Sequence, residues 1–304
     1  MKDFKVHIAV FFLALAMLLA AVLLDARTGR SQSRSRAKPV IRDGGVKRVL
    51  KSTGAPTSPA ARNALLSTEL NWTFGSKPQR GWYLYKPLIS RLLDTKRDAA
   101  SDGLAKAVAR WQKKAGLMPS GVLDDETLYK MIAKWQDERL KDRSSAQPHQ
   151  LLTAPVSDFY DPTRAEELRQ VERATYAAYK RMVSAAVSNR SLGLVRGGKD
   201  NKGELAPDEK YLKIISAFRS REYQEKLRRE SPNSGSAGLA VNSPHFTGRA
   251  LDLYVGGEPV DTRDSNRAVQ VETRVYQWLV RNADRFGFRP YCYEPWHWEY
   301  VGKQ

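Results

Sequence analysis

Apolar positions recur with helical spacing in two neighbouring stretches of the chain. In GLAKAVARWQKKAGL, Leu104, Val108 and Trp111 fall on one helical face, and Gly116 gives the helix a natural end. Beyond a further glycine turn, DETLYKMIAKWQ begins behind acidic residues, which suit the positive end of a helix. We therefore expect a small three-helix domain over residues 66–138.

Strand-like and helix-like patterns mix in the second half of the chain. A helix-periodic stretch over 163–188 precedes the apolar run YLKIISAF, which is typical of a buried strand. The segment REYQEKLRRE then predicts a helix, ALDLYV a strand, ETRVYQWLVRNADRFGF a helix closed by Gly287, and YCYEPWHWEYV a final strand. Because regular strand–helix–strand repetition is missing, the pattern predicts an α+β domain over residues 156–304.

An unbroken apolar run stands near the start of the chain. Lys2 and Lys5 precede the run Ile8–Leu24, and no clean small-residue cleavage site follows it. A run of this length is at the upper range for a signal-peptide core and at the lower limit for a membrane-spanning helix. We expect residues 1–26 to be a signal peptide or a membrane anchor, with the rest of the chain exported.

Two stretches have the composition of linkers. Residues 27–65 are rich in Ser, Arg, Gly and Pro without sustained periodicity, which predicts a basic disordered linker. Residues 139–155 predict a second linker between the helical domain and the α+β domain.

The charge balance favours an anionic partner. The chain carries 51 Lys and Arg against 33 Asp and Glu, a formal net charge of +18, which attracts nucleic acid, phospholipid or an acidic wall polymer. No nucleic-acid motif and no basic stripe interleaved with aromatic residues accompanies this charge, so we expect no nucleic-acid partner. No protein partner is inferred.

The single cysteine, Cys292, excludes an internal disulfide. It lies between Tyr291 and Tyr293, a setting that favours a small buried hydrophobic residue over a catalytic thiol.

Two of the four histidines lie in segments that also carry acids. His245 is followed seven positions later by Asp252, and Glu294 stands three residues before His297. Two imidazoles and one carboxylate leave a fourth tetrahedral position for water, as in catalytic rather than structural zinc sites. The candidate ligands are therefore His245, Asp252 and His297. No two histidines are four residues apart, which excludes a thermolysin-like site.

Glu294 and Arg219 are the candidate catalytic groups. Zinc lowers the pKa of water and polarises a substrate carbonyl, and a carboxylate such as Glu294 then carries the proton to the leaving amine. Positions 294 and 297 would face opposite sides of a regular strand, so we expect a bend at Pro295 to bring both to the metal. Arg219, at the end of a predicted strand, offers a charged fork for a carboxylate or a developing oxyanion.

Three motifs resemble the LAS family of zinc metallopeptidases. SPHFTGRALD is similar to its Ser-x-His-x-x-Gly-x-Ala-x-Asp signature, while EPWHWEYVG and SAFRSREYQ are similar to segments of its vancomycin-resistance-type D-Ala-D-Ala carboxypeptidase branch. The resemblance implies a small antiparallel-sheet domain with flanking helices. It also implies one zinc ion per chain on the three candidate ligands, catalysis by Glu294 and Arg219, and a substrate site lined by Ser243 and Gln224.

The helical stretch resembles the small peptidoglycan-binding domain of many cell-wall hydrolases. That pattern is an apolar helix ending in an aromatic–Gln pair, then Gly-Leu, a glycine turn, and Thr opening the last helix. The matching residues are Trp111, Gln112, Gly116, Leu117, Gly121 and Thr127. A three-helix spacer that binds nothing is the alternative.

Together these observations predict a zinc-dependent peptidase of bacterial cell-wall stem peptides that removes the terminal D-Ala from D-Ala-D-Ala. We expect it in the cell envelope, periplasmic or extracytoplasmic, held at the inner membrane by residues 8–24 if they are not cleaved. Its expected partners are peptidoglycan stem peptides and glycan. One alternative is an endopeptidase that cleaves L-Ala-D-Glu or cross-bridge bonds at the same zinc site, and another is a non-catalytic, zinc-containing peptidoglycan-binding protein.

Overall fold

The computed structural model describes residues 58–198, 203–231 and 239–302. The signal peptide or anchor expected at 1–26 lies outside these residues, as does most of the linker expected at 27–65. Within the described residues, no helix is long and apolar enough to cross a membrane.

The helical N-terminal domain is present, and it begins earlier than residue 66. Helix α2 opens behind Ser58, whose hydroxyl oxygen accepts a hydrogen bond from the N–H of Ala61. Asn63 in this helix is buried and bonds to the backbone of Gly121 and Leu123, so the end of the expected linker belongs to the domain. Its elements are α2 (Pro59–Glu69), β1 (Asn71–Phe74), β2 (Lys77–Arg80), α3 (Lys86–Leu92), α4 (Asp102–Lys114) and α5 (Asp125–Asp137).

A buried glutamine holds the turn between α4 and α5. The amide nitrogen of Gln112 donates to the carbonyl oxygen of Val122 and the hydroxyl of Thr127, and its oxygen accepts from the N–H of Gly121. Gly121 has φ 72°, and a Cβ there would lie 2.9 Å from the carbonyl oxygen of Ala105. Gln112 and Gly121 of the motif thus serve the fold of this domain.

The β1–β2 hairpin was not predicted from the sequence. Trp72 is buried and Phe74 half-buried, while the residues between and beside them are exposed, and Gly75 and Ser76 form the turn with positive φ angles. The helical domain therefore carries a small two-stranded sheet in addition to its helices.

The α+β domain is confirmed, with a four-stranded antiparallel sheet in the order β5–β6–β8–β7. Its strands are β5 (Ile214–Ser216), β6 (Ala250–Leu253), β7 (Phe288–Pro290) and β8 (His297–Tyr300). A second, two-stranded sheet pairs β3 (Leu151–Thr153) with β4 (Gln170–Glu172). The flanking helices are α6 (Arg173–Ser188), α7 (Arg221–Glu230), α9 (Asp264–Glu272) and α10 (Arg274–Asn282).

The two faces of the larger sheet have different roles. Leu251, Leu253 and Trp298 are fully buried in the hydrophobic core. Side chains alternate along a strand, so Asp252 and His297, which pair across β6 and β8, lie on the opposite face. One face of the sheet therefore packs the core and the other carries the candidate chemistry.

Three predicted elements are shorter than expected. The helix predicted from residue 163 starts at Arg173, because Glu172 accepts the first helical N–H groups and Val171 is buried in β4. The helix predicted over ETRVYQWLVRNADRFGF begins at Arg274 and ends at Asn282, because Thr273 caps α10 and separates it from α9. The final strand begins only at His297.

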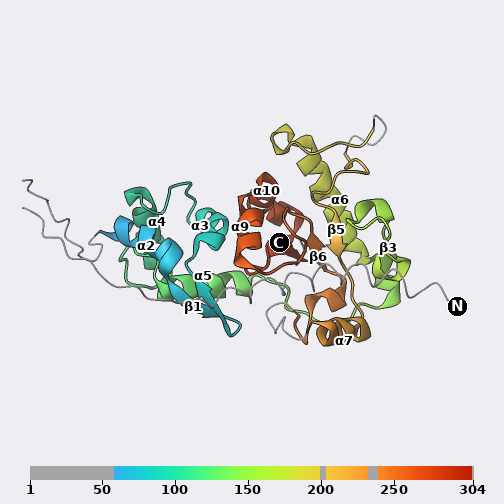
Figure 1. Ribbon diagram of the computed structural model, residues 1–304, viewed down its shortest axis with the longest axis horizontal. Coiled ribbons are helices and arrows are strands. Elements are labelled where there is room, and N and C mark those ends of the chain that lie inside the picture. The colour runs from blue at the N-terminus through green and yellow to red at the C-terminus, as the bar shows by residue number, and fades with distance from the viewer. Residues whose placement is uncertain (1–57, 199–202, 232–238, 303–304) are drawn as a thin grey trace, which may run out of the picture. The chain divides into compact units, whose positions relative to one another are not determined.

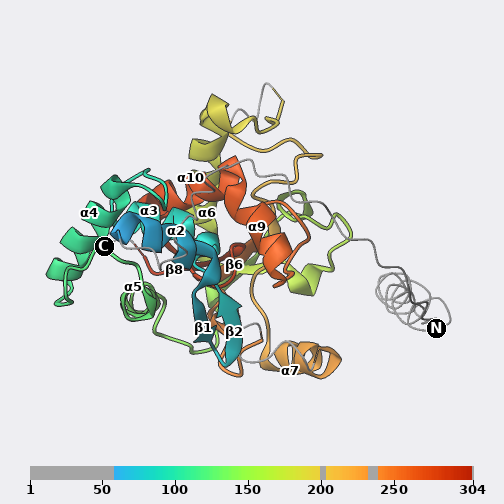
Figure 2. The same cartoon turned by 60° about the vertical axis from the view of Figure 1, so that its left-hand side comes forward.

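The helical domain packs against the α+β domain. Helix α3 lies next to α10 in both views (Figures 1 and 2). Arg91 at the end of α3 donates to the carbonyl oxygen of Val280 at 2.6 Å and forms a 2.6 Å ion pair with Asp284. The two domains are therefore joined by specific contacts as well as by the chain.

Candidate metal centre and active site

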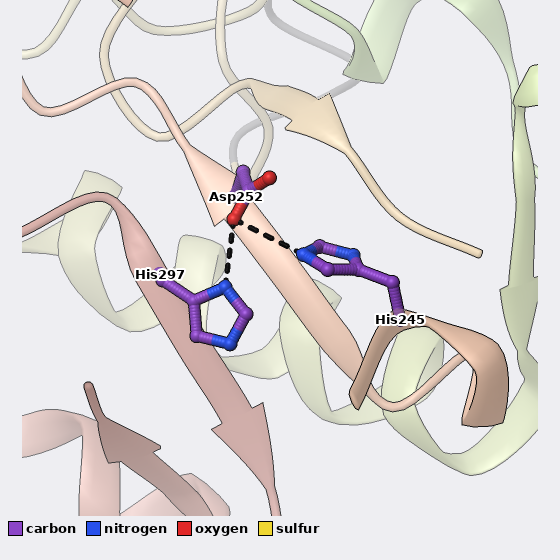
Figure 3. A group of neighbouring side chains, drawn as sticks. All are labelled: His245, Asp252 and His297. Carbon is purple, nitrogen blue, oxygen red and sulfur yellow. Dashed lines mark hydrogen bonds and ion pairs between the residues drawn. The ribbon is translucent and has the colours of Figure 1, made fainter. Parts of the chain in front are cut away.

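The structure brings His245, Asp252 and His297 together. His245 lies in the short 3-10 helix η7 (Pro244–Thr247), Asp252 on β6 and His297 on β8 (Figure 3). One possible ligand atom from each lies within 4.8 Å of the others, and all three residues are buried. Asp252 Oδ1 is 2.9 Å from His297 Nδ1 and 3.3 Å from His245 Nε2. Two imidazole nitrogens and a carboxylate oxygen suit zinc.

Each imidazole has its second nitrogen fixed by an acceptor. His245 Nδ1 is 2.6 Å from the carbonyl oxygen of Ala217, which leaves Nε2 for the cluster. His297 Nε2 is 3.2 Å from Glu299 Oε1, which leaves Nδ1 facing Asp252. Metal-binding histidines commonly have such a second partner, because it sets the tautomer and the ring orientation.

The charges of this group follow from its burial and its neighbours. Burial lowers the pKa of His245 to about 4, and Arg219 adds to that effect. Burial also acts to lower the pKa of His297, but hydrogen bonds to Asp252 and Glu299 outweigh it and raise the pKa to about 9. Burial acts to raise the pKa of Asp252, yet His245 and Arg219 hold it well below its usual value. A metal ion would take the place of the His297 proton.

Local sequence explains how the first two candidate ligands reach the same side. Ser243 caps η7, and its Oγ accepts a hydrogen bond from the N–H of His245 at 3.3 Å. Gly248 then turns the chain into β6 with φ 67°, and a Cβ at that position would lie 3.0 Å from the backbone nitrogen of Glu172. The turn between His245 and Asp252 therefore requires glycine.

Glu294 lies in a turn before β8, and it lines the same cavity as His297. The N–H of Glu294 donates to the carbonyl oxygen of Tyr291, and the N–H of His297 donates to that of Glu294. This is the bend expected around Pro295. Burial raises the pKa of Glu294 to about 8, with His297 opposing the shift and Asp252 adding to it. A nearby cation would lower this pKa again.

Arg219 is held by three side chains. Its Nε donates to Ser216 Oγ at 2.8 Å, its Nη1 to Gln224 Oε1 at 3.3 Å, and its Nη2 to Asp252 Oδ2 at 2.6 Å. Arg219 lines the cavity, whereas Gln224 does not. The Gln224 amide nitrogen donates to the carbonyl oxygen of Ala240. Both polar atoms of this side chain are thus hydrogen-bonded within the protein, although the resemblance implied that Gln224 lines the substrate site.

A cavity of about 390 Å³ opens onto this group. Its lining includes the three candidate ligands together with Glu294, Arg219 and Ser243. Six of the seven residues singled out from the sequence thus meet in one cavity, and Gln224 supports it from behind Arg219.

Three residues that the sequence analysis missed also border the centre. Glu299 lies two residues after His297 on β8 and is fully buried. Arg139 and Arg143 line the cavity and pair with Glu299. Both arginines belong to the stretch 139–155 that was expected to be a linker, and their side chains contact the α+β domain. Strand alternation could have indicated that Glu299 lies on the same face as His297. Nothing in the sequence indicated that Glu299 pairs with Arg139 and Arg143.

The β1–β2 hairpin reaches the turn that carries Glu294. The ring of Phe74 stacks on Tyr293 with centroids 5.2 Å apart. Arg267 is buried and donates to the carbonyl oxygen of Tyr293 and to Gln79 Oε1 in β2. The helical domain therefore helps to shape the turn that carries Glu294.

Cys292 is buried beside this turn and does not line the cavity. Burial raises the pKa of its thiol to about 12, which keeps it protonated and inert. It has the environment of a small hydrophobic residue.

Two family models match parts of the chain. Residues 203–303 match the VanY model, described as D-alanyl-D-alanine carboxypeptidase. The chain carries a VanY-type peptidase domain. Residues 85–131 match the model of a peptidoglycan binding domain, so the VanY-type domain follows a domain of that kind. No curated protein sequence matches the chain.

Three solved structures resemble parts of the chain. The LdcB LD-carboxypeptidase is 23% identical with a TM-score of 0.37, over 52% of this chain and 71% of that one. VanYB in complex with D-alanine-D-alanine is 22% identical with a TM-score of 0.28, over 44% and 72%. A variant of the vancomycin-resistance D,D-pentapeptidase VanY in complex with Zn(II) is 21% identical with a TM-score of 0.28, over 44% and 74%.

The family models support a peptidase of the cell wall with a peptidoglycan-binding domain, acting in the cell envelope.

Proposed function

We propose that this chain is a zinc-dependent peptidase that removes the terminal D-Ala from stem peptides ending in D-Ala-D-Ala. The observation that carries the proposal is the convergence of His245, Asp252, His297 and Glu294 on one cavity inside the VanY-type domain. Paired ligand atoms, a buried acid and a cavity large enough for a peptide end are what metal-assisted hydrolysis requires.

The donor set fits one zinc ion per chain. His245 offers Nε2, His297 offers Nδ1 and Asp252 offers a carboxylate oxygen, and the other nitrogen of each imidazole is already bonded. Three protein ligands leave a position for water or substrate, as catalytic zinc sites do. Zinc, when bound, supplies a Lewis acid that acidifies water and polarises the scissile carbonyl.

Glu294 carries the proton in this proposal. Its carboxyl group is buried next to the candidate ligands, with a pKa of about 8 before a cation is bound. A cation in the site favours the carboxylate, which accepts a proton from the attacking water and then donates it to the leaving amine. A group whose pKa lies near neutrality suits both transfers.

Arg219 and Ser243 act on charge and position. Arg219 fixes Asp252 through its Nη2 and lines the cavity, so it can stabilise negative charge that develops on the substrate. The Ser243 Oγ accepts from His245, which leaves its O–H free to donate to a peptide. Gln224 holds Arg219 in place instead of touching substrate.

In this proposal the helical domain binds the enzyme to peptidoglycan. Its match to a peptidoglycan-binding model supports binding to the wall, where tethering raises the local concentration of stem peptides. Since peptidoglycan lies outside the cytoplasmic membrane, we expect the enzyme to act there. Association with the membrane through residues 8–24 remains an expectation from the sequence.

Mass spectrometry of digested muropeptides tests the proposal. Loss of one alanine from pentapeptide stems is the expected result. Cleavage at L-Ala-D-Glu or at cross-bridges would replace the carboxypeptidase with an endopeptidase on the same site. If the chain bound zinc but cleaved no wall peptide, the result would favour a non-catalytic, zinc-containing peptidoglycan-binding protein.

A further inference from the structure

Glu299 is a buried acid that the proposed mechanism does not use. It lies on β8 two residues after His297, and strand alternation puts both side chains on the same face. None of its surface is exposed. A carboxylate buried to this degree needs hydrogen-bonding or charged partners, so its neighbours should reveal its role.

Glu299 connects a candidate metal ligand to the segment after α5. Its Oε1 is 3.2 Å from His297 Nε2 and accepts from Arg139 Nε at 3.1 Å and Nη2 at 2.5 Å. Arg143 Nη1 lies 3.4 Å from the same oxygen. The other carboxylate oxygen accepts from the N–H of Leu140 at 2.9 Å. Both arginine side chains are at least four-fifths buried, with 15% and 20% exposure.

The partners of Glu299 fix its position. Oε1 accepts from two N–H groups of Arg139 and from one of Arg143, and the other oxygen accepts from the N–H of Leu140. The His297 ring is therefore held at Nε2 by an acceptor that is itself fixed, which leaves Nδ1 on the side of Asp252 and the metal cluster.

We propose that Glu299 is a positioning residue for the metal centre, held in place by Arg139 and Arg143. The inference rests on the proposed zinc site. In this arrangement, a segment outside the VanY-matched residues orients a zinc ligand inside them. Metal affinity therefore depends on the chain that connects the two domains, although that chain supplies no ligand.

A purely structural role would have a different signature. Arg139 also lies over the ring of Tyr291 at 4.0 Å, so the cluster could simply pin the segment to the domain. Loss of a structural ion pair would lower stability with or without metal. Loss of a positioning carboxylate would weaken zinc binding beyond any change in the stability of the metal-free chain.

The test measures zinc affinity of the metal-stripped full chain by competition with a chromogenic chelator. Glu299→Gln keeps the shape of the side chain and removes its charge. We expect zinc binding to weaken on the order of 10–100-fold, the usual effect of losing an outer partner of a ligand histidine. Thermal unfolding of the same metal-free samples reports any loss of stability separately.

Asp158→Asn is the matched control. Asp158 is also a largely buried acid paired with a cation, Lys180 at 3.1 Å, and it does not line the cavity. This change should leave zinc affinity unaltered. Unaltered affinity in folded Glu299→Gln would overturn the proposal.

Arg139 provides a second measurement if Glu299→Gln does not fold. Arg139→Gln should weaken zinc binding and Arg139→Lys should restore part of it, because lysine keeps the charge that orients Glu299. Equal affinity in all three chains would overturn the proposal. If the unaltered chain bound no zinc, the proposed zinc site would be wrong as well. If the unaltered chain bound zinc and no variant changed its affinity, only the role proposed for Glu299 would be wrong.

Discussion

The floor and the rim of the cavity are built from different parts of the chain. The floor comes from β6 and β8, which are neighbours in one sheet, and from the two segments that directly precede these strands, η7 and the turn at Glu294. The rim includes Arg139 and Arg143, and Phe74 from the β1–β2 hairpin packs behind it on Tyr293. Two short strands and the segments before them place the reactive groups, while contacts with residues distant in sequence hold these segments in orientation. Activity should therefore report on domain packing as well as on the ligands.

The largest expected effect is at the floor. Asp252→Ala removes a candidate ligand and leaves Arg219, whose side chain is only 10% exposed, without its carboxylate partner. We expect loss of zinc binding, activity at background, and a cost in folding free energy of about 3–5 kcal/mol, typical of a broken buried pair. Zinc analysis, peptide hydrolysis and denaturant unfolding measure these effects. A folded variant with normal zinc content would remove Asp252 from the ligand set.

Glu294→Gln should separate chemistry from metal binding. We expect kcat to fall on the order of 10²–10⁴-fold, as for other lost proton carriers, while zinc content stays normal. Glu222→Gln, an exposed change in the same domain, is the control. Near-normal turnover by a zinc-loaded Glu294→Gln chain would show that the proton moves through another group.

Arg219→Lys should have a smaller effect, which lowers both kcat and zinc affinity. A lysine cannot hold Ser216, Gln224 and Asp252 at once, and loss of one charge-stabilising donor costs on the order of 10²–10³-fold in kcat. Peptides with free and amidated C-termini distinguish the roles. A rise in KM confined to the free-acid peptide would assign Arg219 to the terminal carboxylate instead.

The metal-free chain should lose stability as the pH rises from about 6.5 to 9. The pKa of His297 is raised to about 9, so its contribution is complete below the unfolded value and is lost as pH passes through 9. The pKa of Glu294 is raised to about 8, so the folded state also binds more protons than the unfolded state up to that pH. For His297 alone the fall should be roughly 3 kcal/mol, since each unit of pKa shift corresponds to about 1.4 kcal/mol, and Glu294 adds to it.

Zinc should flatten this profile, because a bound metal replaces the His297 proton. Thermal unfolding of chelated and zinc-loaded samples across the pH range provides the comparison. Equal slopes for the two samples would mean that the metal binds elsewhere.

The smallest expected effect is at the rim. Phe74→Ala removes the ring that stacks on Tyr293, an interaction of about 0.5–1.5 kcal/mol, so kcat should fall by no more than roughly 10-fold. Phe286→Ala is the matched control: that half-buried ring stacks on Trp278 and does not line the cavity. Equal effects of the two changes would show that the hairpin contributes only general stability.

The same contrast explains what could be predicted from the sequence. His245, Asp252, His297 and Glu294 were found because their spacings are short and their residue types are scarce. The α+β class followed from the order of apolar runs. The start of α6 was wrong because Val171 fits both a helical face and the strand β4, and only pairing with Leu152 decides between them.

The long-range contacts of the rim could not be predicted in this way. Arg139 pairs with Glu299 across 160 positions, and a polar stretch between two domains has no periodicity to indicate such a contact. Glu299 did carry a local signal, since it shares a strand face with His297. The hairpin also had one, in the alternation of Trp72 and Phe74 before Gly75.

Cys292 gives the molecule a practical property. Since this is the single cysteine of the chain and its buried thiol stays protonated, reagents that modify cysteine should leave the unaltered protein unlabelled. A thiol introduced by Ser120→Cys in the helical domain or Glu222→Cys in the VanY-type domain would react alone, because both positions are exposed. Fluorescent dyes at these two sites would then record, molecule by molecule, whether wall fragments change the separation of the domains.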